Sequence, residues 1–146
     1  MLRAMAKTAG PLSRLHRLGR ERRGLLMEAA SALALACAAV AFLPFRRAIR
    51  LGSVESAPGR SGSVSDCAWA VEAAARRLPL RAFCIQKGLA LQRMLRRRGF
   101  DARLHYGARN EVPPGRLHAH VWVSVEGEVV MGGSERPDFA ELAVFP

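Results

Sequence analysis

The chain has 146 residues, of which 50% are apolar and 24% are charged. This length suits one domain with its own core, and the composition excludes a disordered chain. Basic residues number 23 against 12 acidic ones, for a net charge of +11. Such an excess favours an acidic partner (nucleic acid, an anionic membrane or an acidic peptide), although a coding bias toward alanine and arginine produces it as well.

The pattern along the chain divides it into three parts. Residues 1–52 are expected to form a helical region, and 53–65 form a linker rich in serine, glycine and proline. Residues 66–146 are expected to form a compact α+β core. Three leucines at intervals of three, with arginines between them, predict a basic helix near the N-terminus: Leu12, Leu15 and Leu18.

An apolar helix is expected at about 25–43, where Pro44 ends it. Its uninterrupted apolar stretch, 29–43, covers 15 residues, which is shorter than the roughly 20 that a membrane span needs. Glu28 and the many basic residues before it also argue against a signal peptide. We therefore favour a buried core helix over membrane association.

The core begins with two helices. Ser65 or Asp66 is expected to cap the first, which ends before Pro79. The second is expected to begin near Cys84 and to end at Gly99, a glycine suited to the residue after a helix. The three cysteines of the chain form no CxxC pair, and an odd number without an export signal indicates the reducing cytoplasm.

Cys84 is the first candidate for chemistry. At a helix N-terminus, unpaired backbone N–H groups and the helix dipole favour a thiolate, and Arg81 and Lys87 add positive charge nearby. The residue also lies on the apolar stripe that contains Leu91 and Leu95, so a plain core cysteine is the competing interpretation. As a nucleophile, it would need a histidine that is close in space but distant in sequence.

Three strands are expected after the helices, at 102–108, 118–125 and 128–133. A polar loop with Pro113 and Pro114 joins the first two, and a tight turn at Glu126 and Gly127 joins the others. Helices followed by antiparallel strands make the fold class α+β.

The second of these strands carries the candidate base. His118 and His120 face the same side of it, together with Trp122, which could line a substrate groove, shield the imidazole or belong to the core. The two histidines also fit a zinc site with Cys84 or His105 as a further ligand, or a strand with no function at all. In the expected hairpin, Ser124 pairs with Glu128, so His120 lies opposite Gly132, which has no side chain to orient an imidazole.

Together these motifs resemble the protease of lasso-peptide biosynthesis, the B protein of those gene clusters. The resemblance rests on "FCIQKGLALQRMLRRRGFDARLHYGARN" followed by "AHVWVSVEGEVVMGG", and upstream on "LPFRR" and "WAVEAAARRLP". It implies a transglutaminase-like (papain-type) core, in which a cysteine at a helix N-terminus packs on a small antiparallel sheet that carries the histidine. Val121 and Ser124 depart from the family, which has Ala and Glu there.

By position, the resemblance makes Cys84 the nucleophile and His120 the general base, with His118 outside the family's catalytic positions. The family's acid falls at Gly132, so Glu135 or Asp138 from the following turn, a backbone carbonyl or a water is expected to hold His120. The activity implied is a cysteine peptidase that removes the leader peptide from a ribosomally made precursor. No metal and no bound cofactor are expected.

The expected partners are the precursor peptide, a separate leader-recognition protein and a macrolactam-forming cyclase. Three other interpretations remain open: a catalytically impaired scaffold or binding subunit of the same complex, a nucleic-acid binder, and a protein attached to the membrane through residues 25–45. Aromatic residues make up only 6% of the chain, too few to interleave with the arginines as stacking platforms, so we expect no nucleic-acid partner.

Overall fold

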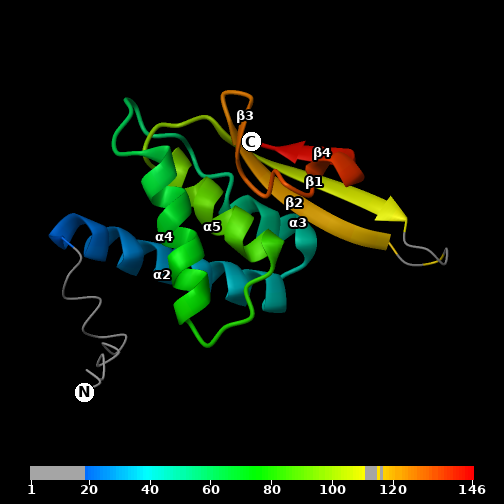
Figure 1. Cartoon of the computed structure of the whole chain (residues 1–146), viewed down its shortest axis with the longest axis horizontal. Coiled ribbons are helices and arrows are strands. Elements are labelled where there is room, and N and C mark those ends of the chain that lie inside the picture. Colours follow the sequence, from blue (N-terminus) through cyan, green and yellow to red (C-terminus); the bar gives the residue numbers. More distant parts are fainter. Residues whose placement is uncertain (1–18, 111–114, 116) are drawn as a thin grey trace, which may run out of the picture.

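The computed structural model describes residues 19–110, 115 and 117–146. Helices come first along the chain and a four-stranded antiparallel sheet follows (Figure 1), so the predicted α+β class is confirmed. The basic helix predicted around Leu12, Leu15 and Leu18 lies outside the described residues, as does the loop with Pro113 and Pro114.

The apolar segment forms helix α2 (Arg20–Phe42), and Leu43 caps its end just before Pro44. Its buried residues recur every three or four positions and so lie on one face: Leu26, Ala29, Ala32, Leu33, Ala36 and Ala39. The prediction of a buried helix is therefore right for one face only, because Phe42 on another face is 85% exposed. Helix α2 is long and apolar enough to cross a membrane, but core helices of soluble proteins and signal sequences meet the same criterion. In this structure, 33% of its apolar stretch is buried.

After α2 the chain turns back through two short helices, α3 (Phe45–Ala48) and the 3₁₀ helix η1 (Ile49–Leu51). The following segment, predicted as a linker, runs along the end of helix α5 (Cys84–Arg96). The Ala57 amide donates to the Arg96 carbonyl at 3.1 Å, and the Ser61 amide donates to the Arg98 carbonyl at 3.0 Å. Backbone hydrogen bonds thus tie this segment to the helical layer.

Helix α4 (Val64–Arg77) begins two residues earlier than a cap at Ser65 would allow. Ser63 is the cap, because its hydroxyl accepts a hydrogen bond from the Asp66 amide at 3.3 Å. Ser65 and Asp66 lie inside the first turn instead, which corrects the prediction. The helix ends at Arg77, before Pro79 as predicted.

Helix α5 begins at Cys84, as predicted. Its last turn is closed by two bonds, from the Gly99 amide to the Arg96 carbonyl at 3.0 Å and from the Phe100 amide to the Leu95 carbonyl at 3.1 Å. This is the Schellman pattern, and Gly99 has the positive φ of 80° that the pattern requires. A Cβ atom at Gly99 would also lie only 2.0 Å from the Gly59 carbonyl oxygen.

The sheet has the strand order β3-β2-β1-β4, and all neighbours are antiparallel. Its strands are β1 (Ala102–Asn110), β2 (Leu117–Val125), β3 (Glu128–Met131) and β4 (Ala140–Phe145). The predicted set of three strands is thus short by one. β4 lies at the edge and alternates little between buried and exposed residues, so its sequence lacks the period of two that marks a half-buried strand.

The hairpin between β2 and β3 turns at Glu126 and Gly127, as predicted, and both residues have positive φ. Its register differs from the prediction by one, because Glu128 pairs with Val125 and not with Ser124. An irregularity between Val123 and Ser124 then shifts the pairing further. The result brings Gly132 beside Val121 and Trp122.

The hydrophobic core lies between the helices and one face of the sheet. It combines side chains from α2, α4, α5, β1 and β2, for example Leu33, Val71, Leu89, Leu104 and Val123. In Figure 1 the helices gather on one side of the molecule and the strands on the other. The opposite face of β2, with His120 and Trp122, is therefore free to build a second cluster.

An ion pair connects helix α2 with the turn that follows α5. The Arg98 guanidinium donates to both carboxylate oxygens of Glu28, at 2.8 and 2.5 Å. These hydrogen bonds hold the pKa of the Glu28 carboxyl below its ordinary value of 4.5. A lowered pKa means that the carboxylate stabilises the fold at neutral pH, and that this contribution disappears as the pH falls below about 4.5.

Replacement of Glu28 by glutamine is expected to lower the free energy of unfolding at neutral pH by about 1 kcal/mol, because the pair is partly exposed and screened. Wild type and variant should converge at low pH. Chemical denaturation at both pH values measures the difference, and Glu21→Gln on the exposed start of the same helix is the control. An equal loss at low pH would mean that packing, not charge, is responsible.

Candidate active site

A cleft of about 400 Å³ opens between the start of α5 and strands β2 and β3. Five predicted site residues line it together: Cys84, His118, His120, Gly132 and Glu135. Sequence positions up to 51 apart thus converge on one hollow, which is what a catalytic centre built from a helix and a hairpin requires.

Cys84 is the first residue of α5 and is half-buried. The first-turn backbone N–H groups of a helix lack intrahelical acceptors, so they can stabilise a negative charge that forms beside the thiol. Gly88, one turn later, allows the helix to pack closely on β2, because a Cβ atom there would lie 2.8 Å from Val121 Cγ1. Close packing at Gly88 brings the start of α5 to the strand that carries His120.

The other two cysteines have different surroundings. All three lie in the described part of the chain as free thiols. Burial raises the pKa of the Cys67 thiol and that of the Cys37 thiol, so both are kept protonated at neutral pH. Of the three, Cys84 alone lines the cleft that contains His120.

His120 is 7% exposed, and its ring is fixed by one strong contact. The Nε2 atom lies 2.8 Å from the Gly132 carbonyl oxygen. A carbonyl oxygen only accepts hydrogen bonds, so Nε2 carries the proton and Nδ1 holds the lone pair of the neutral imidazole. The backbone of Gly132 therefore does what an orienting acid side chain does elsewhere, and Nδ1 is the nitrogen available as a base.

Glu135 lies closer to His120 than the other predicted acid. Its Oε2 is 3.6 Å from His120 Nδ1, and its side chain is 63% exposed. Asp138 instead forms an ion pair with Arg109 at 3.7 Å. Of the two acids proposed from the sequence, the structure therefore brings Glu135, and not Asp138, to the imidazole.

Aromatic rings enclose the other sides of His120. Phe139 lies 5.0 Å from it and Trp122 lies 6.1 Å from it, measured between ring centroids. Trp122 is 1% exposed and is not among the residues that line the cleft. The indole thus shields the imidazole from behind, whereas His118 lines the cleft itself and contacts the edge of Phe139.

His105 belongs to this cluster and not to the cleft. Its ring stacks on Trp122 at 5.4 Å, with an angle of 5° between the planes. Its two nitrogens lie 2.7 Å from Glu141 Oε2 and 2.7 Å from Ser124 Oγ. His105 therefore points away from the zinc site considered above, and no group of three metal-ligating side chains occurs within the described ranges.

A second charged pair, which the sequence did not reveal, borders Cys84. Lys87, one turn into α5, donates to both carboxylate oxygens of Glu72 on α4, at 3.1 and 3.4 Å. Both residues line the cleft. The positive charge expected near the thiol is present, but Glu72 balances it, and a helical pattern alone could not show which acid would meet it.

For the cysteine peptidase expected from the sequence, Glu135→Gln should lower the rate of peptide cleavage by about tenfold, because the carboxylate would stabilise a proton that Nδ1 holds during cleavage. Asp138→Asn is the matched control and should change the rate less than about twofold, since its partner is an exposed arginine. Steady-state rates of both variants against a peptide substrate measure the difference. Equal effects of the two substitutions on the rate would mean that Glu135 takes no part in the reaction.

Comparison with known proteins identifies one matching family. The family model described as the transglutaminase-like superfamily matches residues 27–144, a range that includes most of α2, the cleft, strands β1 to β3 and all of β4 except its last residue. No curated protein and no solved structure matches the chain.

Proposed function

Because the chain belongs to the transglutaminase-like superfamily, which contains cysteine peptidases, we propose that it is a cysteine peptidase that removes the leader peptide from a lasso-peptide precursor. The observation that supports this proposal most directly is the cleft that Cys84 and His120 line together. Cys84 lies at a helix N-terminus, and the Gly132 carbonyl holds the ring of His120. The choice of substrate rests on the ordered motifs of the sequence, which resemble the lasso-peptide protease.

In this mechanism the Cys84 sulfur attacks the carbonyl carbon of the peptide bond between leader and core. His120 Nδ1 takes the thiol proton, and backbone N–H groups in the first turn of α5 stabilise the oxyanion. The proton on Nδ1 then passes to the departing amine of the core peptide. Water, activated by the same nitrogen, hydrolyses the thioester and releases the leader with a free carboxylate.

The cleft offers suitable surfaces for a peptide chain. It is lined by the exposed side chains of Phe83 and His118 and by the Lys87–Glu72 pair. We place the reaction in the cytoplasm, with a separate recognition protein presenting the leader and a cyclase receiving the core. No bound cofactor takes part in these steps.

A catalytically impaired subunit of the same complex is the second candidate. Two observations favour it: the side chain at position 132 is absent, and Glu135 approaches Nδ1, the nitrogen that must receive the thiol proton. Such a protein would bind the precursor or its partners without cutting.

The experiment that separates the two candidates combines the purified chain with a precursor peptide and the recognition protein, followed by mass spectrometry. The proposal expects two products, leader and core, whose summed masses exceed the mass of the precursor by one water. Binding of the precursor without any product would contradict it and favour the impaired subunit.

A further inference from the structure

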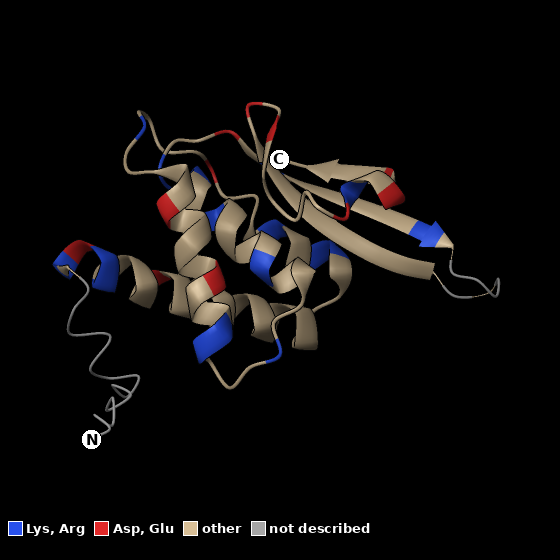
Figure 2. Cartoon of the chain, viewed as in Figure 1, with Lys and Arg blue, Asp and Glu red and all other residues tan. Residues whose placement is uncertain are grey.

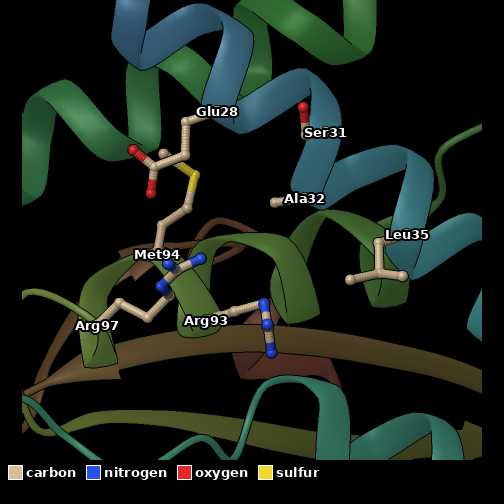
Figure 3. Close-up of a pocket in the computed structure, with 7 residues that line it drawn as sticks. All are labelled: Glu28, Ser31, Ala32, Leu35, Arg93, Met94 and Arg97. Atoms are coloured by element: carbon tan, nitrogen blue, oxygen red, sulfur yellow. The ribbon is translucent and has the colours of Figure 1, made fainter.

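One side of α2, where exposed side chains border buried alanines, forms the wall of a groove. Its residues recur every three or four positions and line two adjoining hollows of about 140 and 530 Å³: Glu28, Ser31, Ala32, Leu35, Ala38, Ala39 and Phe42. Leu35 and Arg93 line both hollows, so the two form one continuous feature, which we call the α2 groove. Figure 3 shows the first hollow, between α2 and α5.

The side of the groove that α2 and its cap form is apolar. Leu35, Leu43 and Phe42 are 45%, 43% and 85% exposed, although aliphatic and aromatic side chains of this size are normally covered. A stripe of them at helical spacing, next to alanines that leave room, matches the surface on which another helix packs.

The rim of the α2 groove is basic. Arg97, which caps the end of α5, reaches toward α2 (Figure 3). Arg93 lines both hollows and donates to the Leu51 carbonyl at 3.1 Å, and Arg47 and Arg50 border the second hollow. Figure 2 shows these basic stretches of α3 and α5 in blue. The one acid in the lining, Glu28, is already held by Arg98, and no ion pair among the described residues involves Arg47, Arg50 or Arg93.

Charge decides between the possible occupants. Residues 1–18 of this chain contain four lysines and arginines and no acid, and a second copy carries +11, so the arginine rim repels both. An anionic membrane would satisfy the charge, but it presents a flat surface to a feature that is concave. We propose that the α2 groove binds an acidic amphipathic helix of a partner protein.

The size of the α2 groove agrees with this occupant. From Glu28 to Phe42 the helix rises about 21 Å, at 1.5 Å per residue. A partner helix of about fourteen residues has the same length. Its apolar residues, at intervals of three and four, would contact Leu35, Ala38 and Phe42, and carboxylates on its flanks would pair with the arginines.

The α2 groove is separate from the catalytic cleft. The two share no lining residue, although α5 contributes to both, with Cys84 at its start and Arg93 near its end. The proposal therefore does not depend on peptidase activity. A partner bound here would hold the same helix that presents the thiol.

The test uses a fluorescently labelled amphipathic peptide of about fourteen residues, with leucines on one face and glutamates on its flanks, and measures its Kd by anisotropy. Arg47→Glu with Arg50→Glu is expected to weaken binding at least about tenfold, and Leu35→Ala about fivefold. Arg76→Glu with Arg77→Glu on α4 makes the same change in net charge and should weaken binding less than about twofold. Circular dichroism confirms that each variant is folded.

Three results would overturn the proposal. An equal loss in the Arg76 and Arg77 double variant would show attraction by net charge alone. Equal binding of a peptide with the same composition in scrambled order would remove the apolar contact. Sedimentation with anionic vesicles that Phe42→Ala abolishes, without binding of the peptide, would assign the surface to a membrane.

Discussion

Cys84→Ala is expected to slow cleavage of the precursor by about 10⁴-fold or more, because removal of a covalent nucleophile leaves only the oxyanion donors and substrate binding. The Kd for the precursor should stay within about threefold, since the thiol makes little binding contact before the reaction. Rates by mass spectrometry and affinity by anisotropy separate these two quantities.

Cys37→Ala provides the matched control for this variant. Cys37 is a free thiol on α2, outside the cleft, and its loss should leave the rate within about twofold. Cleavage that survives Cys84→Ala would contradict the mechanism. It would leave the chain as a binding subunit for some other protease.

Gly132→Ala is expected to lower the cleavage rate by about 10²-fold, because small displacements of a catalytic group are costly. Gly132 has a φ of 77°, and a Cβ atom there would lie 2.7 Å from the Val121 carbonyl oxygen. An L-residue in this conformation costs about 1–2 kcal/mol even before that contact. The backbone must therefore shift, and its carbonyl moves away from His120 Nε2.

Gly133→Ala tests whether the effect belongs to this particular carbonyl. A Cβ atom at Gly133 would meet only the Val129 side chain, at 3.0 Å from Cγ1, and its φ is not in the left-handed region. We expect a change in rate of less than about threefold. A similar loss in both variants would mean that the turn as a whole, and not the contact with His120, controls activity.

Most helices could be predicted because their signals are local. The start of α5 at Cys84 and the glycine after its last turn follow from spacing and from the conformational preference of glycine, and the structure confirms both. The cap of α4 was misplaced, since Ser63 and Ser65 are both acceptable caps by sequence, and only the hydrogen bond to the Asp66 amide distinguishes them.

Strand β4 and the hairpin register could not be predicted for a different reason. β4 is defined by its pairing with β1, a contact between distant segments, and its own sequence alternates weakly. The register shift between Val123 and Ser124 lies in the pairing of β2 with β3, and it changes which residues meet. A single shift of this kind decides whether His120 faces the missing side chain of Gly132 or contacts the Gly132 carbonyl oxygen.

For the candidate site, the sequence indicates the reacting residues more clearly than the residues that position them. Cys84 and His120 have recognisable positions, at a helix start and on a strand face. Phe139, Glu72 and the His105–Glu141 pair do not, because each acts through a contact across the fold. Trp122 was placed on the correct face by strand alternation, but only the packing shows that it lies behind His120 and not in the cleft.

The most direct test of the central claim is an acid-quenched single-turnover reaction of the chain with its precursor and the recognition protein, measured by intact and peptide-mapped mass spectrometry. The mechanism predicts a transient adduct that adds the mass of the leader less one water, joined as a thioester to Cys84 and absent from Cys37 and Cys67. Release of leader and core with no adduct on Cys84 at any time, and at an unchanged rate in Cys84→Ala, would contradict it.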